Sequence, residues 1–367
     1  METNLTNYIE GAPVKVHIDN VVKKFNGRNG EMIALNGVTL DIHDNEFICV
    51  VGPSGCGKST LLNIIAGLLE PTSGEVYCDG KLVEGTGTDR GVVFQQYALF
   101  PHMTVEQNLA AALWAKPRGE RRAAVADKVR AFHLEGLERH RPCQLSGGQQ
   151  QRLALARMLA GEPEALLLDE PFSALDSYLK WQLELDLMDM LGAFPGDVLY
   201  VSHSRDEVCR LCGTVCVLTG GTGEGKEPVG RLMGDPGTVS AALLSGCKNY
   251  SAIRVGPEGL VECLDWGVAL RAGTEAPVGA AFAGVRAHCF HPAGPEDVNR
   301  IPCRVSRVIQ EAFSTVVMLS TPGGSQGRSL VRMELAKEAW SGLGEPSELT
   351  LAVRPEHVML LTGRMEI

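Results

Sequence analysis

The sequence has no apolar run of the roughly 18 residues that a membrane-spanning helix requires, so we expect no transmembrane segment. It also has no block of like charges, and its net charge of −10 at pH 7 disfavours electrostatic capture of nucleic acid or of an anionic membrane. The first residues, METNL, lack the basic start and apolar stretch of a signal peptide. These absences predict a cytosolic protein without a nucleic-acid partner.

Neither a disulfide framework nor a zinc site is expected. The 11 cysteines are odd in number and scattered through the chain, and several lie in apolar runs such as Phe47–Val51, which favours reduced, buried thiols. Cys209, Cys212 and Cys216 follow a C-x2-C-x3-C spacing, but no matching group of His or Cys lies near them. Packing of buried cysteines therefore explains this cluster better than metal binding does.

The first part of the chain has the pattern of an α/β domain. The 367 residues suffice for two or three domains, and a content of 44% hydrophobic and 21% charged residues is typical of a globular protein. Short apolar runs bounded by turn residues alternate with helical patterns. Buried strands are expected within residues 46–52, 91–95, 165–170, 197–203 and 214–220. Helices are expected over Leu179–Met190 and, in a helical insert at 102–150, over Val125–Phe132, whereas the glycine-rich stretch 220–230 is expected as a loop.

The pattern changes after about residue 240 to short alternating strands separated by Gly and Pro, which predicts a small all-β domain. We therefore expect a flexible tail at 1–13, an α/β domain at 14–235 and an all-β domain at 240–367. The all-β domain contains one possible internal repeat. Gly284–His288 and Ala352–His357 both place Val-Arg just ahead of a His. Either the domain consists of two related β-halves or the similarity is due to chance.

A phosphate-binding loop is the strongest motif. Residues 52–60, GPSGCGKST, match G-x-x-x-x-G-K-[ST] between a predicted strand and a predicted helix, as the motif requires. The glycines let backbone N–H groups point inward at phosphate oxygens, and the helix start adds a positive dipole. Lys58 is expected to reach the β- and γ-phosphates and Ser59 to ligate Mg²⁺. The candidate nucleotide-binding residues are Gly52, Ser54, Gly55, Gly57, Lys58, Ser59 and Thr60. The alternative is a chance glycine turn.

Two carboxylates end the strand at 165–170. Asp169 can hold Mg²⁺ through water, and Glu170 can accept a proton from an attacking water. By itself this segment fits equally a strand that ends in solvated acids.

A second anion-binding helix start follows Leu145, in the sequence LSGGQ. Ser146 can cap this helix, and the glycines leave its amides open to an anion, so Ser146, Gly148 and Gln149 are candidate nucleotide ligands. One γ-phosphate does not need two such sites on one chain. With this motif, residues 14–235 resemble the nucleotide-binding subunits of ABC transporters, in which the signature of one cassette closes over ATP bound to the phosphate loop of another.

The resemblance implies a P-loop NTPase cassette, with a RecA-like core and a helical subdomain, that binds ATP and Mg²⁺ and works as a homodimer. Phe25, Gln95, Asp176 and His203 match the family's adenine-stacking aromatic, Q-loop, D-loop and switch histidine. Gln95 would act in catalysis and on the metal, and His203 in catalysis. Phe25 stands where the family usually has Tyr, and the alternative is that Phe25 is an ordinary core residue. For His203 the alternative is a structural histidine without a catalytic role.

The resemblance also implies separate permease subunits, with a substrate-binding protein as indirect partner, and a place at the cytoplasmic face of the membrane. Residues 14–115 look like nitrate, sulfonate and taurine cassettes, while residues from 145 onward look like molybdate and sulfate cassettes. The all-β domain at 240–367, with Arg354-Pro-Glu-His357, resembles the regulatory oligomer-binding (OB-like) modules of import cassettes. We expect an ATP-hydrolysing importer subunit for a molybdate- or sulfate-like oxyanion.

Three alternatives stay open: an importer cassette for nitrate, sulfonate, taurine or another small solute, a soluble ABC ATPase without membrane partners, and a ligand-sensing regulator. The paired cassettes, zinc insertions and long coiled coils typical of the soluble class are not visible in this sequence. The segment 95–102 is expected to dock a permease helix through Tyr97, Leu99 and Phe100, unless these three side chains are core.

Overall fold

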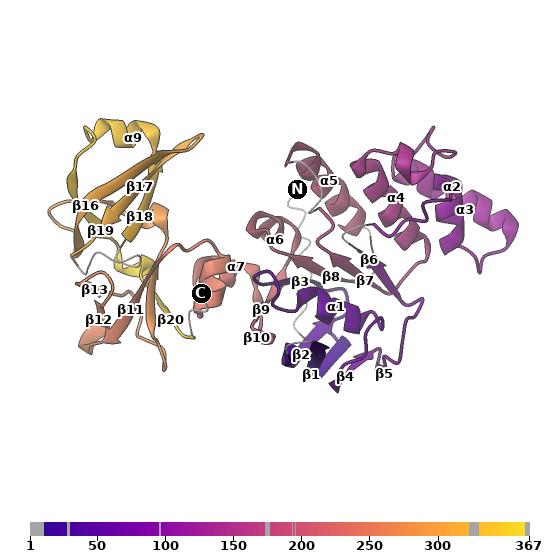
Figure 1. Cartoon of the computed structure of the whole chain (residues 1–367), viewed down its shortest axis with the longest axis horizontal. Coiled ribbons are helices and arrows are strands. Elements are labelled where there is room, and N and C mark those ends of the chain that lie inside the picture. The colour runs from indigo at the N-terminus through magenta and orange to yellow at the C-terminus, as the bar shows by residue number, and fades with distance from the viewer. Residues whose placement is uncertain are drawn as a thin grey trace. The chain divides into compact units, whose positions relative to one another are not determined.

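The computed structural model of the chain describes residues 11–27, 30–94, 97–172, 177–192, 194, 196–322 and 330–363. The chain divides into two compact units, of which the first ends at Val229 and the second begins at Gly230 (Figure 1).

A six-stranded sheet forms the centre of the first unit. Its strand order is β10 (Thr222–Pro228), β9 (Thr214–Thr219), β3 (Phe47–Val51), β8 (Asp197–Ser202), β7 (Ala165–Asp169) and β6 (Arg90–Val93). All neighbours pair in parallel except β10, which runs antiparallel to β9. The five strands expected from apolar runs are confirmed, because strands buried on both faces are continuously apolar.

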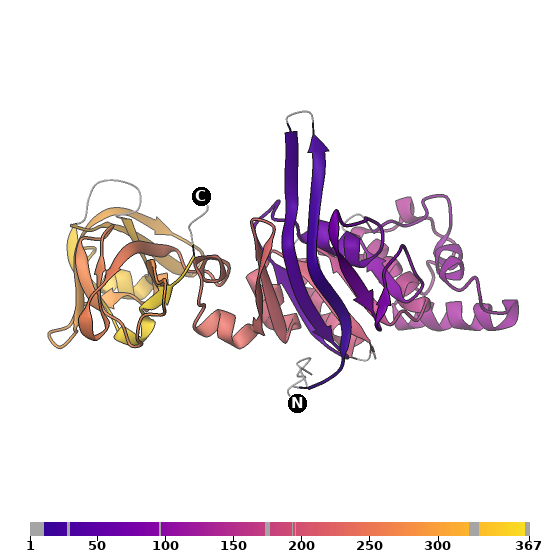
Figure 2. The same cartoon turned by 90° about the horizontal axis from the view of Figure 1, so that it is seen from below.

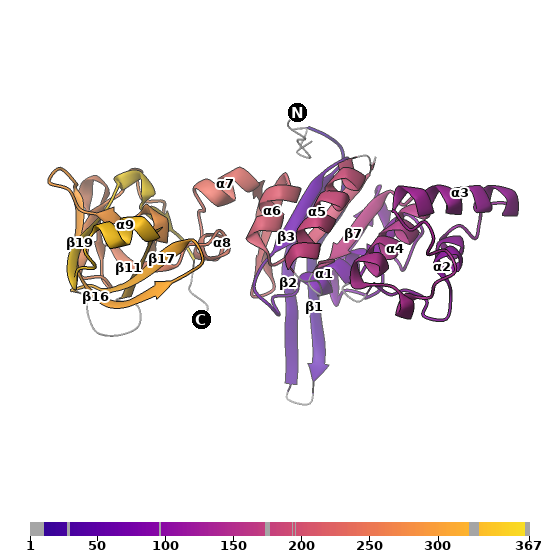
Figure 3. The same cartoon turned by 90° about the horizontal axis from the view of Figure 1, so that it is seen from above.

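Helices flank this sheet (Figure 3). They are α1 (Lys58–Ile65), α4 (Gly147–Ala160), α5 (Ser177–Gly192) and α6 (Arg205–Leu211). The expected helical insert contains α2 (Val105–Ala112), α3 (Arg118–Ala131) and the 3₁₀ turn η1 (Pro142–Gln144). Thr104 caps α2 in a capping box with Gln107, and Val125 and Val129 give α3 its buried face. The expected helices over 125–132 and 179–190 are therefore confirmed in position.

A second sheet in this unit was not expected. Its order is β2 (Gly30–His43), β1 (Val14–Gly27), β4 (Ser73–Cys78) and β5 (Lys81–Leu82), all antiparallel. Ile18 and Leu35 from this sheet share a fully buried core with Leu62 of α1 and Val50 of β3. The far ends of β1 and β2 project as a two-stranded ribbon (Figure 2).

The stretch 220–230 is not the expected loop, because residues 222–228 form β10. Gly220 and Gly221 adopt positive φ of 54° and 80° and make the tight turn from β9. Lys226 then donates to the Glu46 carboxylate at 2.8 Å, and that side chain is only 2% exposed. Thr214 donates to the same carboxylate at 2.6 Å. A buried ion pair therefore holds a strand that has few apolar residues.

The boundary between the units falls just after the first residue of the short helix α7 (Val229–Gly234). The second unit continues with α8 (Val239–Leu244) and then mostly as β-structure. One antiparallel sheet has the order β13 (Val268–Arg271), β12 (Leu260–Cys263), β11 (Asn249–Val255), β14 (Phe282–Val285) and β20 (Met359–Leu361). The other has the order β15 (His291–Pro292), β19 (Glu348–Val353), β16 (Asn299–Gln310), β17 (Ser314–Ser320) and β18 (Leu330–Ala336), which α9 (Lys337–Gly342) follows. Trp266 and Trp340 lie in their common core.

The possible internal repeat in this unit corresponds to a repeated local structure. Arg286 follows β14 with φ −72° and ψ 144° and precedes the 3₁₀ turn η3 (Ala287–Cys289). Arg354 follows β19 with φ −69° and ψ 145° and precedes η5 (Pro355–His357). The same strand-to-3₁₀ transition therefore follows β14 in one sheet and β19 in the other, so the two similar sequence segments also share a local structure.

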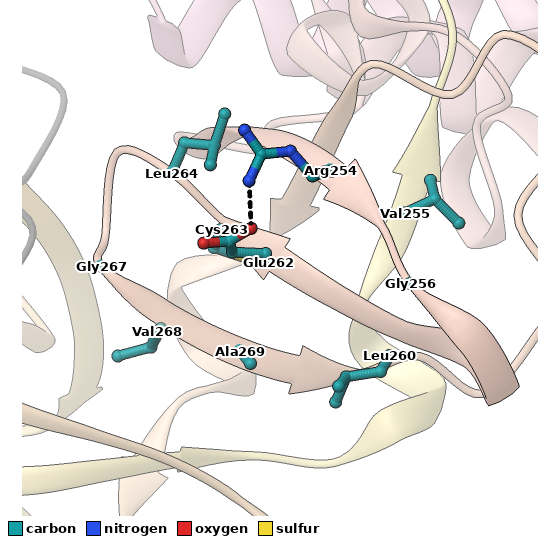
Figure 4. A pocket seen from close by; sticks show the side chains of 10 residues that line it. All are labelled: Arg254, Val255, Gly256, Leu260, Glu262, Cys263, Leu264, Gly267, Val268 and Ala269. Atoms are coloured by element: carbon teal, nitrogen blue, oxygen red, sulfur yellow. Dashed lines mark hydrogen bonds and ion pairs between the residues drawn. The ribbon is translucent and has the colours of Figure 1, made fainter.

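A groove of about 500 Å³ lies over β11, β12 and β13 (Figure 4). Leu260 and Leu264 line it, and an ion pair of 2.8 Å between Arg254 and Glu262 crosses it. This groove belongs to the second unit, whereas the predicted nucleotide-binding residues belong to the first.

Among the described residues, no helix is long and apolar enough to cross a membrane. Cys212 and Cys216 are buried free thiols and Cys209 is an exposed one. Within the same described ranges, no group of three or more His, Cys, Asp and Glu side chains could hold a metal ion.

Asp197, at the start of β8, gives a test of the buried amino end of the sheet. Burial of its side chain, which is 2% exposed, raises the pKa of Asp197 to about 7, and the backbone N–H of Asn45 only partly opposes this. The folded state therefore binds a proton that the unfolded state has released, and stability falls as pH rises from about 4 to about 7. Asp197→Asn should remove this fall. The melting temperature of the variant minus that of the wild type should therefore increase between about pH 5 and about pH 8. The exposed Asp127→Asn should show no such trend, and equal slopes for both variants would contradict the assignment.

Candidate nucleotide-binding site

Three neighbouring strands carry the predicted phosphate and catalytic residues. β3, β8 and β7 are adjacent and parallel, so their carboxyl ends lie at the same edge of the sheet. β3 leads into the phosphate loop, β7 ends at Asp169, and β8 ends just before His203. The fold therefore brings together residues that are more than 100 positions apart in the sequence (Figure 1).

The phosphate loop needs glycine for steric reasons at two positions. Gly57, the residue before α1, has φ 106°, and a Cβ there would lie 2.5 Å from the carbonyl oxygen of Ala34 in β2. A Cβ on Gly52 would lie 2.1 Å from the carbonyl oxygen of Leu218 in β9. The loop is thus wedged between backbone segments of the two sheets, which fixes its curvature.

Lys58 places a positive charge inside this loop. Its ammonium donates to the carbonyl oxygens of Gly52 at 2.9 Å and Pro53 at 3.0 Å, and the residue is only 6% exposed. Ser54, Gly55 and Ser59 are exposed around it, and Thr60 is half-buried. A buried ammonium beneath a turn of exposed backbone is the arrangement that attracts phosphate.

Ser59 connects the loop to β7. Its hydroxyl donates to an Asp169 carboxylate oxygen at 3.1 Å. Burial raises the pKa of Asp169, the Ser59 hydrogen bond opposes this rise, and the charge of Glu170 adds to it. Ser59 and Asp169 thus offer two hard oxygen donors, the type of ligand that Mg²⁺ prefers. A bound Mg²⁺ would offset the cost of keeping the buried Asp169 carboxylate ionised.

Glu170 and His203 form a pair beside these donors. Glu170 adopts a left-handed φ of 44°, its N–H donates to Val201 in β8 at 3.1 Å, and its carboxylate lies 3.2 Å from Nδ1 of His203. The Glu170 side chain is 23% exposed and that of His203 57% exposed. A left-handed φ is uncommon in a non-glycine residue, and His203 pairs with Glu170 while more than half of its side chain stays accessible.

The second predicted anion site begins with the helix cap expected at Ser146. The Ser146 hydroxyl accepts from the Gln149 N–H at 3.3 Å, and the Gln149 side chain accepts from the Ser146 N–H at 2.9 Å, which completes a capping box at the start of α4. Gly148 is buried in its first turn. In the described part of the chain, Ser146 and Gln149 hydrogen-bond with each other and with neither the phosphate loop nor Glu170.

Phe25 lies on the ribbon of β1 and β2, opposite Met32. It is half-buried, and the ammonium of Lys23 lies 5.3 Å from the centre of its ring. An accessible ring disfavours the alternative of an ordinary core Phe. Gln95 and Asp176 lie outside the described residues.

Sequence reasoning missed one member of this region, Glu207 in α6. It is 4% exposed and accepts hydrogen bonds from the hydroxyls of Tyr200 and Ser202. Its only sequence signal is an acid one helical turn after His203.

A family model described as ABC transporter matches residues 35–173. A spermidine/putrescine import ATP-binding protein of Rubrobacter xylanophilus is 34% identical over 376 residues, which cover 97% of this chain and 96% of the relative. The chain belongs to the ATP-binding proteins of ABC transporters. An uncharacterised ABC transporter ATP-binding protein of Methanocaldococcus jannaschii is 46% identical over 218 residues, which cover 59% of this chain and 82% of the relative. A nitrate import ATP-binding protein of Synechococcus elongatus is 42% identical over 56% of this chain and 77% of its own.

A solved structure supports the same family. It is a dimeric ATP-binding cassette in a post-hydrolysis state bound to ADP and Pi, with 35% sequence identity and a TM-score of 0.53 over 58% of this chain and 98% of that one. The cassette fold and the ATP-hydrolysing activity expected from the sequence are confirmed at this level.

Proposed function

We propose that this chain is the ATP-hydrolysing subunit of an ABC importer and acts as a homodimer beneath separate permease subunits at the cytoplasmic face of the membrane. The observation that carries the proposal is the meeting of Lys58, the Ser59–Asp169 pair and the Glu170–His203 pair at one edge of the sheet. Import is supported by the relative that matches this chain along nearly its full length and whose name describes an import ATP-binding protein.

Each residue has a defined task in this proposal. The backbone N–H groups of the phosphate loop and Lys58 hold the phosphates, while Ser59, Asp169 and Gln95 hold Mg²⁺. When bound, Mg²⁺ neutralises charge on the β- and γ-phosphates. Glu170 accepts a proton from the attacking water, and His203 orients Glu170 from 3.2 Å away. Phe25 stacks on the adenine.

The signature helix is proposed to act on the ATP of the other copy. Ser146 and Gln149 make no hydrogen bond to their own phosphate loop among the described residues, and their capping box fixes a helix start that is exposed at Ser146 and Gly147. Ser146, Gly148 and Gln149, together with Asp176, would face the nucleotide bound to the partner. The solved relative is a dimer of cassettes, which supports this arrangement.

The β-rich second unit is proposed as the regulatory, OB-like domain over 240–367, appended to a cassette over 14–235. Two observations support a separate role. It has its own apolar core around Trp266 and Trp340, and none of the predicted nucleotide-binding residues lies in it.

The cargo is a separate proposal. We infer a molybdate- or sulfate-like oxyanion from the sequence phrases around Ser177–Lys180 and Ser202–Glu207. The relatives are named for other solutes, spermidine/putrescine, sn-glycerol-3-phosphate and nitrate, so they give this choice no specific support.

Reconstituted with its permease, the chain should hydrolyse ATP faster with binding protein loaded with molybdate or sulfate than with nitrate or a polyamine. Stimulation by a polyamine alone would replace the oxyanion assignment.

Glu170→Gln tests the catalytic assignment. The amide keeps the size of the side chain but cannot accept the proton, so turnover should fall by roughly 10²-fold or more while ATP still binds and traps a dimer in size-exclusion chromatography. The matched control is Lys58→Ala, which should lose ATP affinity and therefore never form that dimer. Wild-type turnover in Glu170→Gln would mean that another group is the base.

The segment after Gln95 is proposed to dock a permease helix through Phe100. Phe100 is 40% exposed and packs on the guanidinium of Arg157, 4.9 Å from the ring centre, while Leu99 is half-buried. Tyr97 is only 9% exposed, so the expectation that it offers a surface anchor is wrong. Tyr97 also adopts a positive φ of 58°, in a turn where its side chain is buried.

Phe100→Ala should therefore lose permease assembly and transport while the ATPase rate and melting temperature of the isolated subunit stay near wild type. Tyr97→Ala is the comparison, because truncation of a buried aromatic should cost about 3 to 5 kcal/mol of stability. A comparable loss of stability in Phe100→Ala would assign that ring to the core instead.

A further inference from the structure

A buried carboxylate stands directly behind the segment that carries His203. Glu207 lies in α6, is 4% exposed, and accepts from the Tyr200 hydroxyl at 2.6 Å and from the Ser202 hydroxyl at 2.6 Å. Its other oxygen forms an ion pair with Lys180 of α5. Burial alone would raise the pKa of Glu207, but the hydrogen bonds from Lys180, Ser202 and Tyr200 outweigh it and lower the pKa. Glu207 is therefore a fully compensated buried anion.

The network reaches both residues that flank His203. Ser202 precedes it and donates its hydroxyl to Glu207, while the N–H of Ser204 donates to the Ser202 hydroxyl at 2.9 Å. The Ser204 hydroxyl in turn accepts from the Glu207 N–H at 3.5 Å, which caps α6. The main chain before and after His203 is thus held to one carboxylate, although the imidazole itself is 57% exposed.

Lys180 extends this network to another element. It lies in the first turn of α5, the helix that follows Asp176 of the predicted D-loop in the sequence. A second ion pair joins the same two helices one turn further along, between Glu184 of α5, which is 2% exposed, and Arg210 of α6. Among the described residues, one ion pair between α5 and α6 lies beside the His203 segment and another lies one helical turn away from it. Figure 3 labels both helices.

We propose that Glu207 is a positioning residue for ATP hydrolysis, which fixes the backbone on both sides of His203 so that its Nδ1 stays 3.2 Å from the Glu170 carboxylate and, through Lys180, registers this segment against the start of α5. The inference rests on the roles of Glu170 and His203 in the proposed function. In this proposal the Lys180–Glu207 ion pair between α5 and α6 supports catalysis, whereas the Glu184–Arg210 ion pair between the same helices does not.

Glu207→Gln tests this directly, with Arg210→Met as the matched control. Loss of the anion should let the His203 segment shift, so kcat should fall on the order of tenfold to hundredfold while KM for ATP stays within about twofold, because the phosphate loop is untouched. Arg210→Met breaks the other ion pair between the same helices and should keep kcat within about twofold, whatever it does to the melting temperature. Ser202→Ala removes a single hydroxyl and should show the same selective loss of kcat even where Glu207→Gln folds poorly.

His203→Ala separates the inference from the proposed function. If His203→Ala loses turnover but both Glu207→Gln and Ser202→Ala keep the wild-type kcat, the positioning role is wrong and the catalytic assignment stands. If Arg210→Met lowers kcat as much as Glu207→Gln does, the effect is general helix packing and the positioning role is again wrong. If His203→Ala itself turns over normally, the catalytic assignment fails first.

Discussion

The pairing of β3, β8 and β7 as parallel neighbours is the constraint on which the site depends. None of the catalytic distances is set locally, since Ser59 and Asp169 are 110 positions apart, and they meet only because β8 pairs with β3 on one side and with β7 on the other. The apolar side chains that make these strands bury both faces are thus also what brings the hydroxyl, the carboxylates and the imidazole together.

Buried charge is used differently at the two ends of these strands. At the amino end, the Lys226–Glu46 pair fastens an edge strand, and Asp197 favours the protonated form. At the carboxyl end, Asp169 remains under-compensated beside Glu170, while Glu207 is fully compensated. Glu46 and Glu207 each have an ion-pair partner among the described residues, whereas at Asp169 burial outweighs the stabilisation that Ser59 and Lys58 provide, and a cationic ligand can supply the rest.

The sequence predicted what depends on local pattern and missed what depends on distant partners. Continuous apolar runs predicted the buried strands, and fixed spacing predicted the loop from Gly52 to Ser59. β1 and β2 were missed because they are long, partly exposed and interrupted by register shifts. β10 was missed because a buried ion pair, rather than apolar side chains, holds it. Glu207 looks like any acid of an exposed helix until Tyr200, Ser202 and Lys180 surround it.

The wedging of the phosphate loop limits how this enzyme could be altered. At Gly52 and Gly57 a single methyl group would collide with the main chain of β9 or β2, so no rotamer change could accommodate it. Ser54 is exposed, and nothing lies within 4 Å of a Cβ built on Gly55, although its φ of 81° still disfavours other residues. Ser54 is therefore the position at which side chains can be exchanged to tune nucleotide affinity or preference while the backbone curve survives.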